Sequence, residues 1–209
     1  MSITRQDILN WLTACAKSLE ENRDYLIELD AAIGDADHGA NMDRGFKAIL
    51  QKLPSINDED LGAILKTVGM TLVSTVGGAA GPLYGTFFLQ MGTKLSGKTE
   101  MTFSDWIDAL EAGINGVKMR GKADIGDKTM LDALLPALQA LKQKSLEGAA
   151  MKEALSSSAE AARQGMEATI PLVARKGRAS YLGERSAGHQ DPGATSSYLI
   201  LKAAAESWE

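Results

Sequence analysis

The sequence predicts an all-α protein whose helices run up and down against one another. Along most of the chain, apolar residues recur with the spacing of an amphipathic helix, whereas the alternating Val, Ile, Thr and aromatic pattern of a strand is scarce. The helical stretches are joined by connections of two chemically different kinds. Because short connections favour antiparallel neighbours, we expect successive helices to alternate in direction.

Eight helices are expected. The first runs from near Thr4 to Leu29, with Thr4 as its N-cap and Asp7 in the capping-box position. The second spans about 41–53 and ends before Pro54, because proline lacks the amide hydrogen that a helix uses. The third begins after Asn57, where three consecutive acidic residues suit a helix N-terminus. The remaining helices are expected at about 80–94, 102–119, 127–144, 148–172 and 193–207.

Composition favours one domain over residues 1–209 and a reducing cytoplasm. The single cysteine, Cys15, lies in an apolar helical pattern and is expected to be a small buried hydrophobe. No stretch approaches the roughly 18 uncharged apolar residues of a membrane span, so no membrane partner is expected. The net charge of -5 and the scattered Lys and Arg residues disfavour a nucleic-acid partner. An acidic protein that binds a polyanion needs metal ions.

The two kinds of connection alternate along the chain. Those after the second, fourth and sixth helices are short and chemically bland: PSIN, SGKTEM and SLEG. Those after the first, third, fifth and seventh helices are rich in glycine and polar groups: DAAIGDADHGAN, STVGGAAGP, RGKADIGDKT and ARKGRASYLGERSAGHQDPGAT. If the helices alternate in direction, all four special loops emerge at the same end and build a single site.

The first special loop contains a candidate metal site. Asp30, Asp35 and Asp37 surround a flexible Gly34 just before a helix, and such a set of oxygen ligands suits a hard divalent cation. An EF-hand calcium loop does not fit, since Phe46 stands where its bidentate Glu is needed. A solvated, capped turn is the alternative. Like charges crowded between two helices repel one another, which favours a compensating cation.

A candidate phosphate site follows the three aspartates directly. His38, Gly39, Ala40 and Asn41 begin the second helix, where free N–H groups and the positive end of the helix dipole favour an anion. About -3 from the aspartates and about -3 from ADP would be prohibitive at contact, and roughly two Mg²⁺ ions bring the sum near -2. For His38, and for His189 in the last loop, a hydrogen-bonding role is the alternative to catalysis.

The second and third special loops suggest contacts to a nucleotide. The glycine-rich turn at 75–82 lets the backbone approach a phosphate or nucleoside, although close helix packing explains such a run equally well. It is not a Walker A loop, since no Gly-Lys-Ser/Thr follows at the required spacing. In the third loop Asp127 is expected to cap a helix, Met130 to cover a purine, and Lys122 and Lys128 to be exposed charges.

The fourth special loop, from 174 to 195, is too long to be a simple connection. Tyr181 and Leu182 are expected to anchor it, and Asp191 with Pro192 is expected to begin the last helix, where Asp191 either caps the helix or binds a ribose hydroxyl. Arginine forks suit phosphate oxygens and can neutralise charge on a transferring phosphoryl group. The loop brings a cationic cluster to an acidic protein: Arg175, Lys176, Arg178 and Arg185.

Four motifs, GDADHGANM, TVGGAAGPLYGTF, GDKTM and KGRASYLGERSAGHQDPGAT, together resemble the nucleotide-binding L subunit of bacterial dihydroxyacetone kinase over essentially the whole chain. The resemblance implies a closed antiparallel barrel of eight up-and-down helices, with ADP or ATP and two Mg²⁺ ions at one rim. It assigns Asp30, Asp35 and Asp37 to the metal ions. Because phosphoryl transfer depends mainly on positioning and charge neutralisation, Arg178 is expected to act in catalysis. The resemblance assigns these residues to the nucleotide: His38, Gly39, Ala40, Asn41, Ala79, Ala80, Gly121, Met130, Arg178, Asp191, Pro192 and Gly193.

The resemblance also implies partners. A chain without a substrate domain is typical of the phosphoenolpyruvate-dependent form, in which ADP stays bound. There a K subunit holds dihydroxyacetone on its own histidine, and a phosphocarrier M subunit recharges the nucleotide. A homodimer is expected. The isolated chain is expected to turn nothing over, because it has no Walker lysine and no serine nucleophile beside a base.

Three alternatives remain open. One is an ATP-exchanging subunit of a dihydroxyacetone kinase or a related ketose kinase. A second is an additional regulatory role, in which the ADP-bound form engages a transcriptional activator. The third is a purely structural helical module, which the acidic trio and the arginine-rich loop disfavour.

Overall fold

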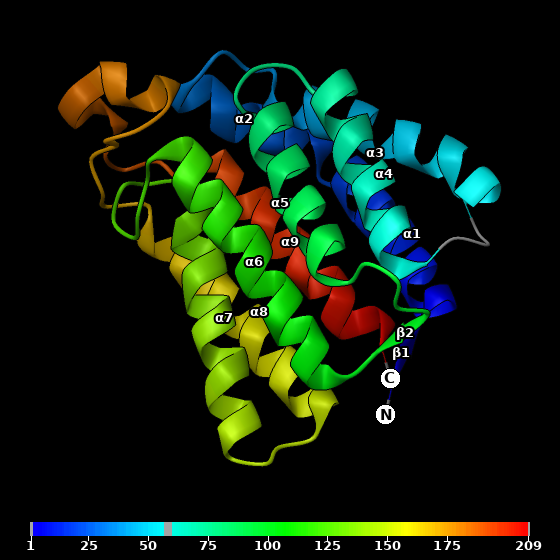
Figure 1. Ribbon diagram of the computed structural model, residues 1–209. Coiled ribbons are helices and arrows are strands. Elements are labelled where there is room, and N and C mark those ends of the chain that lie inside the picture. The colour runs from blue at the N-terminus through cyan, green and yellow to red at the C-terminus, as the bar shows by residue number, and fades with distance from the viewer. Residues whose placement is uncertain (1, 57–59, 209) are drawn as a thin grey trace.

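The computed structural model describes residues 2–56 and 60–208, and it is predominantly helical, as predicted. Helices fill most of this part of the chain (Figure 1). The α-helices are α1 Arg5–Glu21, α2 Arg23–Ile33, α3 His38–Ile56, α4 Leu61–Thr75, α5 Ala80–Lys94, α6 Phe103–Gly121, α7 Leu131–Leu146, α8 Met151–Ala168 and α9 Pro192–Ser207. A 3₁₀ helix, η1, spans Arg178–Ser186. No helix among the described residues is both long and apolar enough to cross a membrane.

The helices pack mainly against their neighbours in the chain. Contacts join α3 to α4, α4 to α5, α5 to α6, α6 to α7, α7 to α8 and α8 to α9, and α1 packs against both α3 and α9. The loop between α4 and α5, the loop between α6 and α7, helix α2 and η1 all lie at the upper end in Figure 1. The α7–α8 connection and both termini lie toward the opposite end. The four special loops therefore emerge together.

The first predicted helix is in fact two helices, so the prediction of eight was wrong: the described residues contain nine α-helices. The division falls at Asn22, whose backbone is not helical (φ -100°, ψ 9°). Its side-chain amide donates to the carbonyl of Ser18 at 2.8 Å, so Asn22 binds the end of α1. Helix α2 then packs chiefly against α3 and α9 instead of continuing along α1. The competition of an Asn side chain for main-chain carbonyls explains the break.

Other helix boundaries also differ from prediction. Helix α3 continues through Pro54 to Ile56, because a proline in the last turns removes only one hydrogen bond from a helix that is about to end. Helix α4 is capped by Asp60, whose carboxylate accepts from the N–H of Ala63 at 2.9 Å. The predicted N-terminal signal at Asn57, with the acidic residues 58 and 59, lies outside the described residues.

A minimal β-ladder corrects the expectation of a purely helical chain. β1 (Ile3–Thr4) and β2 (Glu100–Met101) pair antiparallel, with Ile3 opposite Met101. Both of these apolar side chains are buried. Helices α1 and α6 begin directly after the two strands, each with a capping box, and the predicted box of Thr4 and Asp7 is confirmed. The ladder thus fixes the two helix starts side by side.

The core is largely apolar and contains the three tryptophans. Trp11, Trp106 and Trp208 pack edge to face, with ring centroids 4.8 to 5.6 Å apart. The indole N–H groups of Trp11 and Trp208 donate to main-chain carbonyls at 3.0 Å. Cys15 is fully buried here, and burial raises the pKa of its thiol, so it behaves as the predicted hydrophobe.

Helices α4 and α5 approach each other through pairs of glycines. A methyl group on Gly69 would lie 2.7 Å from the carbonyl oxygen of Gly85, and one on Gly62 would lie 2.5 Å from that of Gly92. Only glycine allows such a close approach of two backbones. The turn between these helices carries Gly77 and Gly78 into the site described below, so the packing sets the position of that turn.

We therefore expect Gly69→Ala to destabilise the fold by roughly 1–3 kcal/mol, because the added methyl group meets backbone atoms that cannot move aside. Urea unfolding followed by circular dichroism measures this change. Gly116→Ala in α6 is the matched control, since its nearest neighbours are side-chain atoms of the exposed Gln90 and of Thr86, and no backbone atom lies among them. An equal effect at both positions would contradict close α4–α5 packing.

Candidate nucleotide and metal site

A cavity of about 790 Å³ opens at the end of the molecule where the four special loops meet. Each loop contributes lining residues, at 30–38, 77–80, 128–130 and 175–181, and the start of α9 completes the wall. Helices α3, α5, α7 and α9 all begin at this cavity, because the alternating direction of the helices brings their N-termini to one end. Four positive helix ends thus surround the space, an arrangement that favours a polyanionic ligand.

The three aspartates converge on one side of this cavity. One carboxylate oxygen from each of Asp30, Asp35 and Asp37 lies within 4.8 Å of the others. Asp30, in the last turn of α2, is buried, whereas Asp35 and Asp37 are exposed. Between them Ala36 has a left-handed backbone (φ 63°), which turns the chain sharply inside the loop. Three oxygen donors at this spacing fit the demands of a hard divalent cation.

Asp30 also supports the local fold. Its Oδ2 accepts hydrogen bonds from the N–H groups of Asp37 and His38, at 2.9 and 3.2 Å, and so satisfies donors at the start of α3. Its Oδ1 lies so close to Gly34 that a Cβ there would be 2.0 Å away, which explains why the loop needs glycine. One carboxylate therefore stabilises the loop and still faces the cavity.

Arg178 lies directly beside the three aspartates. Its Nη2 is 2.9 Å from Oδ2 of Asp35, although the two residues are far apart in the sequence. Both side chains are substantially exposed, so the ion pair contributes little to stability. The contact shows that the first and fourth special loops meet. It also places a guanidinium where it can compensate negative charge in the cavity.

His38 is held by a buried polar network at the base of the cavity. Its Nε2 lies 2.8 Å from Oγ of Ser196 in α9, which in turn lies 2.7 Å from the hydroxyl of Tyr84 in α5. The Tyr84 hydroxyl also contacts Oγ of Ser197 at 2.8 Å. Burial lowers the pKa of His38, while the carboxylates of Asp30 and Asp37 oppose this change. A neutral, fixed imidazole follows, which agrees with a hydrogen-bonding role.

Asp191 begins α9, as predicted. Its carboxylate accepts from the N–H of Ala194 at 2.7 Å, and Pro192 occupies the first turn. The pKa of Asp191 is raised to about 7, mainly by burial. The charge of Asp132 also raises this pKa, whereas the hydrogen bond from Ala194 and the charge of Lys128 lower it. This carboxyl group faces the same cavity as the three aspartates.

Most residues predicted to bind the nucleotide line the cavity: His38, Ala79, Ala80, Met130, Arg178, Asp191, Pro192 and Gly193. Gly121 lines a smaller neighbouring cavity of about 260 Å³, which Ala79 and Met130 also border. Gly39, Ala40 and Asn41 line neither space. A Cβ on Gly39 would lie 2.1 Å from the carbonyl oxygen of Arg23, so this glycine lets α3 pack against α2. The carbonyl oxygen of the Asn41 side chain accepts from Arg44.

Three predictions for the loops were wrong. Lys128 is buried instead of exposed, since its ammonium group binds main-chain carbonyls inside the protein. Tyr181 does not anchor the fourth loop, because its side chain is 87% exposed; Leu182 does, by packing against a small apolar cluster. Asp127 does not cap α7, which begins at Leu131; it accepts instead from the N–H of Asp124.

Sequence reasoning missed several polar residues around the cavity. Tyr84 lies one turn after Ala80 on α5, and Ser196 lies one turn after Pro192 on α9. Helical spacing from the predicted site residues was the signal that could have identified both. Asp132 accepts from the N–H groups of Gly126 and Thr129, and so shapes the third loop. Nothing in its local sequence distinguishes it from an ordinary helix-start aspartate.

The family model for the DAK2 domain matches residues 32–206, which is most of the chain. The chain belongs to the DAK2 domain family. It is 48% identical over 202 residues to the PEP-dependent dihydroxyacetone kinase, ADP-binding subunit DhaL, of Escherichia coli, with 97% of this chain and 96% of the relative covered. It is 42% identical over 200 residues to the PTS-dependent dihydroxyacetone kinase, ADP-binding subunit DhaL, of Lactococcus lactis, with 96% of each covered.

This DAK2 chain also resembles parts of longer proteins. The dihydroxyacetone kinase of C. freundii in complex with AMP-PNP and Mg²⁺ aligns with a TM-score of 0.72 and 28% identity, over 95% of this chain and 33% of the other. The L-erythrulose 1-kinase of Mycolicibacterium smegmatis is 36% identical, over 89% of this chain and 33% of the relative. The chain spans about a third of each of these proteins.

The raised pKa of Asp191 predicts a pH dependence for the nucleotide-free DAK2 chain. The folded pKa of about 7 exceeds the ordinary value of 3.8, so the folded state binds this proton more tightly than the unfolded state. The stabilisation is complete below pH 3.8 and is lost as the pH rises through about 7. The loss amounts to at most about 1.4 kcal/mol per pH unit.

Asp191→Asn should therefore flatten the decline of the unfolding free energy between pH 5 and 7, as measured by urea unfolding at each pH. Asp108→Asn is the control, because Asp108 is half exposed in a surface ion pair with Lys94. Parallel pH profiles for wild type and Asp191→Asn would contradict a buried, proton-binding Asp191.

Proposed function

We propose that this chain is the ADP-binding subunit of a phosphoenolpyruvate-dependent dihydroxyacetone kinase, and thus a phosphotransferase that acts on an alcohol group. The observation that supports this most is end-to-end similarity to chains of that name, at 48% identity, together with a cavity that unites an acidic trio with cationic residues. Magnesium-bound ADP or ATP, kept in place, would carry the phosphoryl group from a phosphocarrier M subunit to dihydroxyacetone on a K subunit.

Sequence identity supports the separate-subunit form. The chain is 48% and 42% identical to two bacterial ADP-binding subunits, whereas it is 36% identical to the matching part of the longer L-erythrulose 1-kinase. An ATP-exchanging kinase subunit remains the alternative function, supported by the likeness to the AMP-PNP complex. A cytoplasmic homodimer, and an additional contact of the ADP-bound form with a transcriptional activator, complete the proposal.

The proposal includes a closed barrel of eight helices. The helix contacts support a closed ring. Each helix from α3 to α9 packs against the next, and α1 packs against both α9 and α3. Helix α2 would then lie outside the ring of eight, across the end that carries the cavity. The nucleotide site would occupy this rim, where the N-termini of α3, α5, α7 and α9 open.

Asp30, Asp35 and Asp37 fit the role of ligands for two Mg²⁺ ions. Their carboxylates share one side of the cavity, and three negative charges so close together favour cation binding. Such ions neutralise phosphate charge and fix the orientation of the phosphates. The glycines at 77–78 and the start of α9 line the cavity and would provide backbone N–H groups for the phosphates. Ala79, Gly121 and Met130 border the smaller, mainly apolar space that suits a purine.

Arg178 has the proposed catalytic role of neutralising charge on the transferring phosphoryl group. It lies at the mouth of the cavity, next to Asp35 and accessible from outside. Phosphoryl transfer depends mainly on positioning and charge neutralisation. A guanidinium at this place can therefore assist the reaction by neutralising negative charge. The accepting hydroxyl and its general base would come from the partner that covers the mouth.

We expect the double variant Asp35→Ala, Asp37→Ala to be purified without bound ADP, because the phosphates would lose the cations that separate them from Asp30. Absorbance at 260 nm and chromatography of the nucleotide released from purified, dialysed protein measure the content. The matched control is Asp24→Ala with Asp108→Ala, which makes the same change of charge at residues away from the cavity. Full ADP content in the Asp35, Asp37 variant would refute the metal assignment.

The reaction itself can be reconstituted from the chain, the K and M subunits, Mg²⁺, dihydroxyacetone and a phosphoenolpyruvate-driven phosphocarrier. Arg178→Ala should lower triose phosphate formation roughly 10- to 100-fold with the fold intact, because an exposed cation supports the reaction and not the core. Arg185→Ala is the control in the same segment, since Arg185 is exposed and does not line the cavity. Rapid formation by the chain alone would refute the subunit model, and formation with K and ATP but without M would favour the ATP-exchanging alternative.

A further inference from the structure

Lys128 is a buried lysine at the wall of the cavity. Its side chain is 1% exposed, and its backbone is left-handed (φ 62°), a conformation that disfavours residues with a side chain. The ammonium nitrogen lies 2.6 Å from the carbonyl oxygens of both Ser186 and His189, and 3.0 Å from that of Leu172. The carbonyl oxygen of Ile170 lies at 3.5 Å. The three protons of the ammonium are thus satisfied by main-chain acceptors.

These acceptors come from the two ends of one segment. Ile170 and Leu172 directly follow α8, whereas Ser186 and His189 precede α9. The intervening residues form an excursion that leaves the helices and returns, and we call residues 170–189 the rim segment. We call the place where the two ends of the rim segment meet its neck. Lys128 binds the backbone on both sides of this neck. A hydrogen bond from the N–H of Gly188 to the carbonyl of Ile170, at 2.7 Å, closes the neck beside it.

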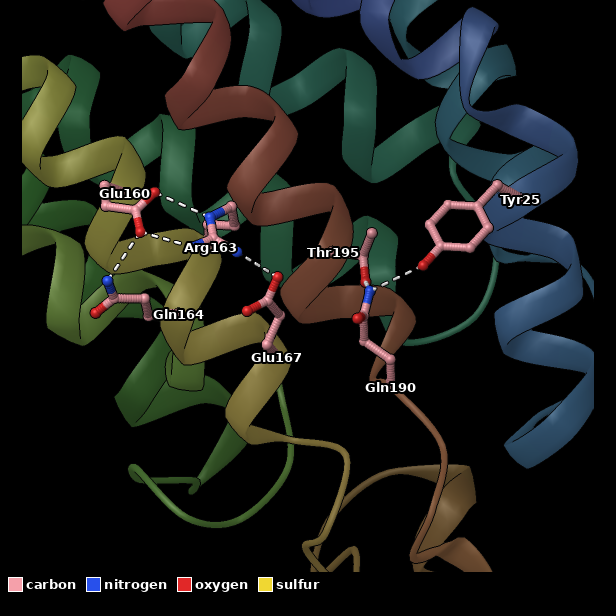
Figure 2. Close-up of polar contacts among 7 residues, drawn as sticks. All are labelled: Tyr25, Glu160, Arg163, Gln164, Glu167, Gln190 and Thr195. Atoms are coloured by element: carbon pink, nitrogen blue, oxygen red, sulfur yellow. Dashed lines mark hydrogen bonds and ion pairs between the residues drawn. The ribbon is translucent and has the colours of Figure 1, made fainter.

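The rim segment has little else to hold it in place. Its buried apolar contacts form a cluster of Ala174 and Ala179 with Ile33 of α2, against which Leu182 packs. Beyond the neck, Gln190 donates to the hydroxyl of Tyr25 at 3.3 Å and to Oγ1 of Thr195 at 2.9 Å, which ties the segment's exit to α2 and α9 (Figure 2). Within the segment, the N–H of Arg175 donates to the carbonyl of Asp127 at 3.1 Å, and Arg178 forms the exposed ion pair with Asp35. These few contacts are a weak support for an excursion of this length.

Lys128 is a buried charged residue that is compensated in an unusual way. Among the described residues no carboxylate lies within ion-pair distance of its ammonium, so carbonyl dipoles carry most of the compensation. Burial lowers the pKa of Lys128, and the charge of Asp191 opposes this change. A buried, charged side chain with a left-handed backbone is costly in two ways. Such a cost is offset when the group satisfies several carbonyls that would otherwise be buried without partners.

We propose that Lys128 is a positioning residue that closes the neck of the rim segment and thereby holds Arg178 beside Asp35. Arg175, Lys176 and Arg178 all line the cavity from this segment, and Arg178 reaches Asp35 across it. Lys128 touches the segment's backbone and not Arg178 itself, so it acts through the path of the chain. The link to phosphoryl transfer rests on the proposed function, whereas the closing of the neck does not.

The neck is tested on the purified chain with its bound nucleotide and Mg²⁺, by limited digestion with trypsin. The rim segment contains four cleavage sites, at Arg175, Lys176, Arg178 and Arg185. Lys128→Met keeps the length of the side chain but loses its charge and donors, and we expect it to raise cleavage within the segment about tenfold, with the helical circular dichroism unchanged. The matched control is Lys122→Met, since Lys122 is an exposed lysine with a left-handed backbone (φ 47°) in the same loop.

The link to Arg178 is tested by a double-mutant cycle on phosphoryl transfer in the reconstituted system. We expect Lys128→Met to lower the rate at least tenfold in the wild-type background, but less than twofold in the Arg178→Ala background, because there is then no guanidinium to misplace. A purely structural lysine would give equal losses in both backgrounds.

Each other outcome overturns the proposal. Unchanged cleavage in Lys128→Met would show that the neck does not depend on the lysine, and equal rate losses in both backgrounds would remove the link to Arg178. Loss of helical structure would show that Lys128 supports the whole helical fold instead of the segment. If the wild-type chain supports no transfer at all, the proposed function fails, while the digestion result still decides whether Lys128 closes the neck.

Discussion

The site depends on the crowding of three carboxylates at one end of a helical protein that is itself acidic. Oxygens of Asp30, Asp35 and Asp37 lie within 4.8 Å of one another, in a chain of net charge -5. The surrounding structure compensates this charge in two ways: N–H groups donate to Asp30, and Arg178 pairs with Asp35. The N-termini of α3, α5, α7 and α9 add positive potential at the same end. This last contribution follows from topology, since alternating helices place every second N-terminus at one rim.

The sequence predicted the parts of this arrangement that are encoded locally. Helical periodicity and the capping residues Thr4 and Asp191 identified most of the helices, and the two kinds of connection identified the end that carries the site. The cavity does draw on all four special loops, and it gathers Asp35 and Arg178 as expected. Local signals were sufficient here because glycine, proline and capping residues act over one turn of the chain.

The errors arose where a distant part of the chain decides the role of a residue. Lys128 resembles any loop lysine until the carbonyls of the rim segment enclose it. Nothing near Gly39 in the sequence reveals its packing role, in which an added Cβ would lie 2.1 Å from the carbonyl oxygen of Arg23. The first helix ends at Asn22, whose side chain binds the carbonyl of Ser18, but the new direction of α2 depends on its packing against α3 and α9. Periodicity describes which face of a helix is buried, but not which helix covers it.

Burial changes steadily from the base of the site to its mouth, and this gradient bears on how the chain can work. At the base, His38, Tyr84 and Asp191 are buried in polar networks that fix their positions. Toward solvent, Asp35 and Arg178 are largely accessible, and Tyr181 of the rim segment is 87% exposed. Under the proposed function, the rigid groups at the base would orient the nucleotide, and the accessible charges at the mouth would lie near the acceptor of the phosphoryl group. An enzyme that completes its reaction alone encloses the reacting groups to exclude water. Asp35 and Arg178 remain accessible at the mouth of the cavity. Under the proposed function, a second protein surface would therefore exclude water from the reacting groups.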